Sequence, residues 1–179
     1  MSLRRFIAGV FGFAALLLCA QASNAGTLIA PNVVTISPSL VTSGQPTAAS
    51  LKSLASDGFR AVIYLAPTNS MDAIAGEADM VRAQGMEWIN IPIDFGEPTE
   101  PEFTKFVETM ERLKGQKVLV HCQVNMRAST FTFLYRVIAL HEAPEQAYEA
   151  VAKVWSPRGP WKRLAIAQLQ KAGIAFEPY

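Results

Sequence analysis

The stretch KVLVHCQVNMRAS, Lys117 to Ser129, joins a short apolar run to a segment with helical spacing. The run VLV is apolar, and two of its three residues are β-branched, which is typical of a buried strand. Cys122 follows this strand directly, and Arg127 lies at the start of the helical segment. A strand that passes through a short loop into a helix is the repeating unit of α/β folds, so we expect that fold class.

The same alternation continues outward from this junction in both directions. Apolar or β-branched runs at residues 33–36, 40–42, 61–65, 88–93 and 117–121 predict strands. Helical spacing predicts helices at about residues 47–56, 73–84, 101–114, 126–141, 144–154 and 161–172. Strands that alternate with helices predict a central, mostly parallel sheet flanked by helices, in a single domain over residues 26–179.

The first 25 residues have the character of a signal peptide. Arg4 and Arg5 precede an apolar run over residues 6–20, and Ser23-Asn24-Ala25 resembles a cleavage site. The run is shorter than the roughly 20 residues that span a bilayer. We therefore expect cleavage after Ala25, a periplasmic or secreted protein, and no stable membrane insertion afterwards.

Composition narrows the function classes. A formal net charge of +1 and 50% hydrophobic residues indicate a globular protein and give no reason to expect a nucleic-acid partner. After signal cleavage Cys122 is the single cysteine, so it forms no internal disulfide. It is either a small buried hydrophobe or a reactive thiol.

The position of Cys122 favours a reactive thiol over a buried hydrophobe. Ligands of parallel α/β sheets gather at the carboxyl ends of the strands, where the loop after Cys122 lies. Backbone N–H groups of a tight loop and the positive end of a helix dipole bind anions and favour a thiolate. The planar guanidinium of Arg127 is suited to holding two oxygens of a tetrahedral oxyanion.

Several motifs resemble the dual-specificity-like branch of the protein tyrosine phosphatase superfamily. They are Ser43-Gly44-Gln45-Pro46, the strand at 61–65, WINIPID at 88–94 and KVLVHC at 117–122. The chain is most similar to the bacterial phosphatase-like family associated with beta-lactamase-hydrolase-like proteins. The resemblance implies a cysteine-dependent phosphatase fold and a phosphocysteine intermediate, with His121, Cys122 and Arg127 at the signature positions.

The loop departs from the superfamily pattern in its length. Most members have five residues between Cys and Arg and then Ser or Thr, whereas this chain has four, namely Gln123, Val124, Asn125 and Met126, and Ala128 precedes Ser129. The nearer family also contains four-residue loops, commonly with glycine, and we expect Asn125 to take the left-handed conformation instead. The four loop residues are predicted to bind substrate through their amides.

Ser129 is expected either to hydrogen-bond the departing thiolate or to bond its own helix backbone. Asp94 is the predicted general acid, because it ends a strand expected to neighbour that of Cys122. Glu97 and Glu100 are substitutes on the same loop. The alternative is that all three are solvated charges.

The two histidines are assigned supporting roles. His121 is interpreted as structural support that holds backbone carbonyls, and His141 as a partner of a helix dipole. Two histidines and one cysteine make a poor zinc site, so we expect neither metal nor cofactor.

The leading hypothesis is an exported hydrolase of phosphomonoesters, whose substrate is a phosphorylated protein, such as one bearing phosphotyrosine, or a phosphorylated small molecule. Cys followed by four residues and a basic one also occurs in rhodanese-like sulfurtransferases, so a Cys122 persulfide carrier is an alternative. A catalytically silent phosphate-binding domain is the third.

Overall fold

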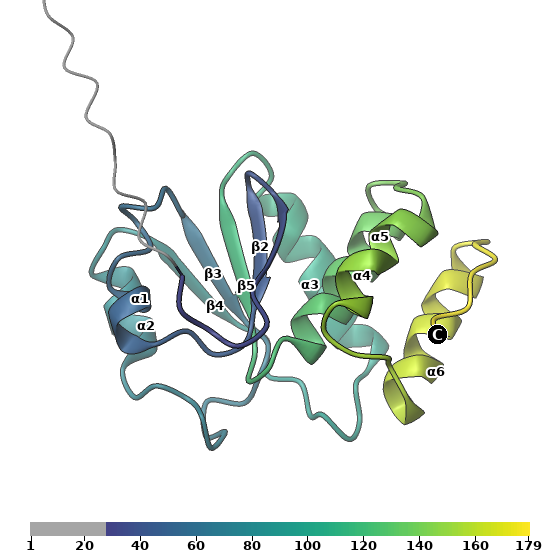
Figure 1. Ribbon diagram of the computed structural model, residues 1–179, viewed down its shortest axis with the longest axis horizontal. Helices are drawn as coiled ribbons and strands as arrows, with labels where there is room; N and C mark the ends of the chain where they lie inside the picture. Colours follow the sequence, from purple (N-terminus) through teal and green to yellow (C-terminus); the bar gives the residue numbers. More distant parts are fainter. Residues whose placement is uncertain (1–27) are drawn as a thin grey trace, which may run out of the picture.

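The computed structural model describes residues 28–179, so the expected signal peptide lies outside the described residues (Figure 1). Five short strands and six helices make up this part of the chain. In order they are β1 (Val34–Ser37), β2 (Leu40–Ser43), α1 (Ala48–Leu51), β3 (Ala61–Tyr64), α2 (Glu77–Arg82), β4 (Glu87–Asn90), α3 (Glu100–Arg112), β5 (Val118–His121), α4 (Met126–Ile138), α5 (Pro144–Ala152) and α6 (Gly159–Lys171).

The strands form one sheet in the order β1-β2-β5-β3-β4. β1 and β2 are an antiparallel hairpin at one edge, and all other pairs are parallel. The expectation of an α/β fold with a mostly parallel sheet is therefore confirmed. β5 is the central strand, so its two neighbours, β2 and β3, fix its register on both sides.

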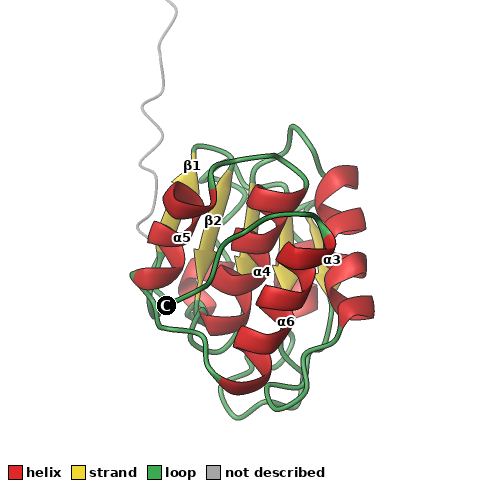
Figure 2. Ribbon diagram, turned by 90° about the vertical axis from the view of Figure 1, so that its right-hand side faces the viewer, coloured by secondary structure: helices red, strands yellow, loops and turns green. Residues whose placement is uncertain are grey.

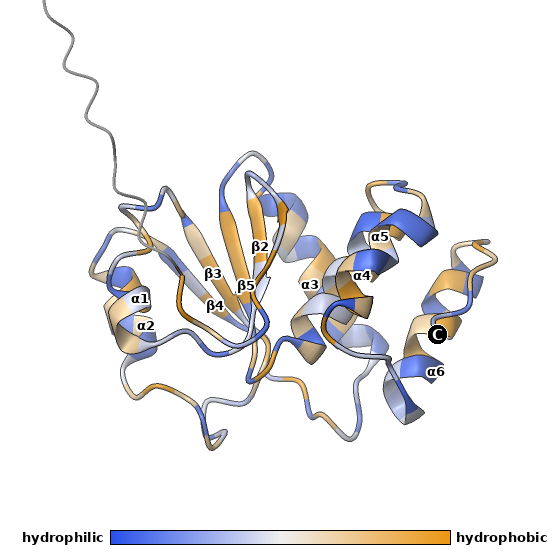
Figure 3. Cartoon of the chain, viewed as in Figure 1, coloured by the Kyte–Doolittle hydropathy of each residue, from blue (hydrophilic) through white to orange (hydrophobic). Residues whose placement is uncertain are grey.

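Helices cover both faces of the sheet, and Figure 1 shows α1 and α2 on one face and α3 to α6 on the other. Figure 2 shows α6 lying outside α4, farther from the sheet. The central strands β3 and β5 are mostly apolar (Figure 3), and the three apolar residues of β5, Val118, Leu119 and Val120, are buried. Because both faces are covered, the strand is a continuous hydrophobic run.

The helix predicted at 47–56 covers only Ala48–Leu51, and turns follow it. Two further elements differ in extent. The helix predicted at 73–84 begins only at Glu77, because Gly76 before it has a left-handed backbone with φ of 74°. The strand predicted at 88–93 ends at Asn90, shortly before Pro92, which has no N–H to donate to a neighbouring strand. Both differences lengthen the loops at the carboxyl edge of the sheet. Within residues 28–179, no helix is long and apolar enough to span a membrane.

The larger core is centred on Phe131 of α4, which is fully buried against Phe103, Phe106 and Trp161. Replacing Phe131 by Ala should lower the free energy of unfolding by about 3–5 kcal/mol, because it removes these contacts and leaves a cavity. Urea denaturation measures the change. The exposed substitution Lys105→Ala should stay within about 0.5 kcal/mol of the wild type, and an equal loss in both variants would contradict this account of the core.

Candidate active site

The loop between β5 and α4, residues 122–126, lies at the carboxyl ends of the parallel strands. Cys122 at its start is fully buried. The Cys122 N–H donates to the carbonyl of Ser43, the last residue of β2, at 3.3 Å. The cysteine is thus fixed where two strand ends meet, as the sequence predicts.

Four carbonyl groups of the loop, those of residues 123–126, accept hydrogen bonds from the surrounding protein or from α4. The contacts are Gln45 N to Gln123 O at 2.9 Å, Asn32 Nδ2 to Val124 O at 3.0 Å, Ser129 N to Asn125 O at 2.8 Å, and Thr130 Oγ1 to Met126 O at 2.9 Å. Four successive carbonyls are therefore held by residues outside the loop.

The amide groups show the opposite pattern. Among the described residues, no acceptor is bound to the N–H groups of Gln123, Val124, Met126 or Arg127. These groups lie at the N-terminus of α4, a helix of 13 residues, where the helix dipole adds positive potential. Unpaired amides at a helix N-terminus form an anion-binding site.

Asn125 gives the loop its curvature. Its φ is 72°, so the expected left-handed conformation is confirmed. Its Nδ2 group also donates to Asn32 O at 2.6 Å and to Thr42 Oγ1 at 3.1 Å. Asn125 therefore supplies a backbone conformation that glycine tolerates and adds two bonds that glycine lacks.

Gly44, in the motif Ser43-Gly44-Gln45-Pro46, lies directly against the loop. A Cβ atom at Gly44 would lie 2.7 Å from the carbonyl oxygen of Gln123 and 2.8 Å from the Cβ of Pro31. Only glycine allows this approach, which brings the N–H of Gln45 to the Gln123 carbonyl. The motif is thus the outer support of the loop.

Arg127 lies in the first turn of α4 and is buried. Its Nε donates to Ile93 O at 3.1 Å and its Nη1 to Gln123 Oε1 at 3.2 Å. The guanidinium also lies over the ring of Phe95, with its carbon 5.1 Å from the ring centre. Arg127 therefore connects the cysteine loop to residues 93–95.

This connection places Asp94 beside Arg127, because the residues on either side of Asp94 both contact the guanidinium. The Asp94 side chain is exposed, and its Oδ1 accepts the N–H of Gly96 at 2.7 Å. Phe95 anchors the segment, since its carbonyl accepts from Trp161 Nε1 at 2.8 Å. Of the substitutes, Glu97 is exposed and Glu100 is paired with Lys171.

The hydroxyl of Ser129 donates to Met126 O at 3.2 Å, within its own helix. This contact agrees with the second of the two expected roles of Ser129, a bond to the backbone of its own helix.

Val124 is partly exposed and Met126 is half-buried in the cysteine loop. His141 is exposed and lies beyond the end of α4 with φ of 56°.

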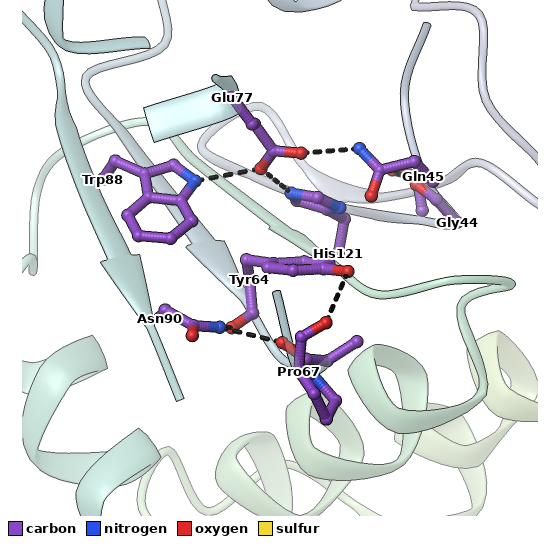
Figure 4. A network of polar contacts seen from close by, with 10 residues as sticks. Gly44, Gln45, Tyr64, Pro67, Glu77, Trp88, Asn90 and His121 are labelled. Carbon is purple, nitrogen blue, oxygen red and sulfur yellow. Dashed lines mark hydrogen bonds and ion pairs between the residues drawn. The ribbon is translucent and has the colours of Figure 1, made fainter. Parts of the chain in front are cut away.

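The interpretation that His121 holds backbone carbonyls is wrong. Its Nε2 instead lies 2.9 Å from Oε1 of Glu77, a carboxylate at the start of α2 (Figure 4). A carboxylate reaches the ring because α2 covers this face of the sheet and its Glu77 side chain points inward.

Glu77 is the residue that the sequence reasoning missed. Its carboxylate also accepts from Gln45 Nε2 at 2.6 Å and from Trp88 Nε1 at 2.9 Å. Burial would by itself raise the pKa of Glu77, but the three N–H donors, His121 foremost, hold the pKa below its usual range. The sequence contains a signal: Glu77 shares a helix face with Val81 and Gln84, at i+4 and i+7.

Within residues 28–179, no group of three or more His, Cys, Asp or Glu side chains is arranged to hold a metal ion. The site described above consists of a thiol, a guanidinium, a carboxylate and backbone amides.

Two substitutions at Asn125 should separate backbone strain from hydrogen bonding. Asn125→Gly and Asn125→Ala both remove the bonds to Asn32 and Thr42, but only Ala is strained at a φ of 72°. Asn125→Ala should therefore unfold more easily than Asn125→Gly by about 1 kcal/mol in urea denaturation. Equal stability of the two variants would show that the left-handed backbone is not a constraint here.

Acid should destabilise the protein through Glu77. Because the pKa of Glu77 is lower in the folded chain than the ordinary value of 4.5 for a glutamate, its contribution to stability is complete above about pH 4.5 and is lost as the pH falls through the folded value. The Glu77→Gln variant has no carboxylate at this position, so it lacks this pH-dependent contribution to stability. Its free energy of unfolding should fall less steeply than that of the wild type below pH 4.5, and parallel curves in urea titrations at several pH values would refute the assignment.

Comparisons with solved structures place this geometry among phosphatases. The chain is similar to a "putative phosphatase (DUF442)" from Shewanella putrefaciens CN-32, with 28% identity and a TM-score of 0.73 over 80% of this chain and 94% of that one. Two further structures share the fold. PTPMT1 is 21% identical, with a TM-score of 0.65 over 79% of this chain and 96% of that one. The core catalytic domain of the PP-IP phosphatase SIW14 from S. cerevisiae is 13% identical, with a TM-score of 0.65 over 78% and 87%.

A search of curated proteins finds no match. The family model described as "DSP-PTPase phosphatase fused to NAD+ Kinase" matches residues 34–163, which include every strand and the whole cysteine loop. The matched segment covers most of the chain and contains both Cys122 and Arg127. The protein therefore belongs to this family, a dual-specificity-like branch of the protein tyrosine phosphatases, which are phosphoric monoester hydrolases.

Proposed function

We propose that the protein is an exported, cysteine-dependent hydrolase of phosphomonoesters that acts through a phosphocysteine intermediate. Cys122 is the nucleophile, Arg127 and the loop amides bind the phosphoryl group, and Asp94 is the general acid. The export part rests on the signal-peptide character of residues 1–25 and implies a periplasmic or secreted location.

The proposal rests on the hydrogen bonding of the cysteine loop, whose carbonyls have partners while most of its N–H groups have none within residues 28–179. Its carbonyls are held from outside, while the N–H groups of Gln123, Val124, Met126 and Arg127 have no acceptor among the described residues. A phosphoryl group presents three oxygens with negative charge, which suits several convergent donors. Cys122 begins this loop, so a bound phosphoryl group lies next to its sulfur.

Arg127 has donors to spare for such a group. Its Nε and one N–H of Nη1 are used by Ile93 and Gln123, and no protein acceptor among residues 28–179 takes Nη2. The edge formed by Nη1 and Nη2 therefore suits two phosphoryl oxygens. Arg127 would hold the substrate while staying attached to the segment that carries Asp94.

The reaction has two steps. The Cys122 thiolate attacks phosphorus, the P–O bond to the leaving group breaks, and Asp94 gives its proton to that oxygen. Water then attacks the phosphocysteine, Asp94 takes a proton from it, and the P–S bond breaks to release phosphate and the thiolate. Asp94 is exposed, so it has access to both the leaving group and water.

The surroundings of the loop favour an ester with an apolar or aromatic group. Phe95 and Val124 are 39% and 37% exposed, although both are large apolar side chains. Phe95 lies against Arg127, and Val124 is part of the cysteine loop. Phosphotyrosine is an ester of this kind. The structurally similar PTPMT1 has been solved in complex with PI(5)P, a different phosphate ester.

Hydrolysis of an aryl phosphate by the purified protein tests the proposal. Cys122→Ser should abolish turnover, because a hydroxyl is a far weaker nucleophile at neutral pH than a thiolate. Asp94→Asn should lower kcat by about 10²–10⁴-fold, the usual contribution of a general acid. Glu97→Gln, on the same loop, should keep wild-type activity and is the matched control.

Two other outcomes would contradict the proposal. Transfer of sulfur from thiosulfate that depends on Cys122 and not on Asp94, without phosphatase activity, would indicate a sulfurtransferase. Binding of phosphate without turnover of any aryl phosphate would indicate a silent phosphate-binding domain.

A further inference from the structure

Phe95, the residue after the proposed acid Asp94, lies against two tryptophans. Its ring centre is 5.8 Å from that of Trp155 and 5.7 Å from that of Trp161. The ring centres of the two tryptophans are 6.2 Å apart, and their planes make an angle of 70°. Tilted aromatic pairs at these distances attract one another. The segment that carries Asp94 is therefore attached through Phe95 to the region where α6 begins.

The two tryptophans hold Phe95 in different ways. Trp161, in the first turn of α6, is 1% exposed, and its Nε1 donates to Phe95 O at 2.8 Å. Trp155, between α5 and α6, is half-buried, and its Nε1 has no hydrogen-bond partner among the described residues. Trp155 therefore acts on Phe95 through ring contact alone.

The loop that carries Asp94 has few other attachments. Residues 94–98 are part of the irregular segment between β4 and α3. In the part of the chain that the structure describes, the bond from Trp161 to Phe95 O is the one hydrogen bond that joins these residues to the rest of the protein. Their other hydrogen bonds are internal and end on Asp94, and an open hollow lies between the end of the loop and α6. Beyond Ile93, the position of Asp94 therefore depends on how Phe95 is held.

The positions of the two tryptophans are set independently of this loop. Residues 156–160 join them and include two prolines, each of which restricts the backbone to a narrow range of φ. Trp161 also packs on Phe131 of α4, with ring centres 5.6 Å apart. Since α4 also carries Arg127, the same helix fixes both Trp161 and the guanidinium on which Phe95 lies.

We propose that Trp155 and Trp161 are positioning residues of the phosphatase site: they clamp Phe95 beside Arg127 and so keep Asp94 where its proton reaches the leaving group. The inference rests on the proposed function, because it concerns how the general acid is held. Both tryptophans act through Phe95 and take no part in the proton transfer itself.

Two phosphate esters with different leaving groups test this role. Phenyl phosphate releases a base about as strong as the side-chain oxygen of tyrosine, with a pKa of about 10, so its release needs a proton from Asp94. Dinitrophenyl phosphate releases a much weaker base and needs little help. Trp155→Ala should lower kcat/KM about tenfold for phenyl phosphate, a part of the roughly 10²–10⁴-fold contribution of a general acid, and less than about twofold for the dinitrophenyl ester. Trp155→Phe keeps an aromatic ring against Phe95 and should restore most of the loss.

Phe176→Ala is the matched control for lost aromatic packing. Phe176 is also half-buried, and its ring packs on Phe133 and Tyr148. This variant should keep the wild-type ratio of kcat/KM for the two esters. Equal losses with both esters in Trp155→Ala would show general support of the fold or of Arg127 and would overturn the proposal. A wild type that turns over neither ester would instead refute the proposed function itself, and with it this role of the tryptophans.

A double-mutant cycle shows whether Trp155 acts through Asp94. With phenyl phosphate, Trp155→Ala combined with Asp94→Asn should lose no more kcat/KM than Asp94→Asn alone, because the acid that the tryptophan positions is then absent. Additive losses would overturn the proposal.

Hydrogen exchange tests the clamp without any catalysis. The indole N–H of Trp161 is bound to Phe95 O, so a looser Phe95 in Trp155→Ala should make this N–H exchange with solvent about fivefold faster or more, as measured by NMR. The indole N–H of Trp88, bound to Glu77, is the internal reference and should keep its rate. An unchanged rate at Trp161 would overturn the proposal whether or not the protein is a phosphatase.

Discussion

The loop after β5 can present its amides to an anion only because its carbonyls are bound from the other side. A peptide unit that turns its N–H inward turns its C=O outward, and a buried carbonyl without a donor is costly. Two of the four donors, Asn32 and Gln45, are distant from the loop in sequence, and the other two, Ser129 and Thr130, lie in α4. The site is therefore a property of the assembled sheet, and the family model covers the whole sheet together with the cysteine loop.

Arg127 shows how the shorter loop can still serve such a site. With four residues after Cys122 instead of the usual five, the guanidinium lies against Ile93 O and the Phe95 ring. The same side chain thus joins the two segments that carry the proposed nucleophile and the proposed acid. On the opposite face of the sheet, the hydrogen bond between Glu77 and His121 ties α2 to the residue directly before the cysteine. The two faces make different contributions: one orients the reacting groups and the other holds the strand that carries the cysteine.

Local patterns were sufficient to predict the α/β class, every strand and the position of Cys122 at a strand end, because hydrophobic period and strand order are encoded in neighbouring residues. The left-handed backbone of Asn125 was also predictable, since few residue types tolerate it. The partner of His121 was not, because it depends on how α2 packs on the sheet. Gly76 shortened the helix predicted at 73–84 for a similar reason: a left-handed glycine breaks a pattern that hydrophobic spacing alone would continue.

The bonds between Asn32 and the cysteine loop have a consequence for how the protein acquires its site. Asn32 and Asn125 are 93 positions apart, so closing this contact carries a large entropy cost that only a nearly complete tertiary structure repays. During synthesis, the first part of the chain must wait for the last third before the loop takes its shape. The special environment of Cys122 therefore arises late in folding, and an unfinished or unfolded chain carries only an ordinary thiol.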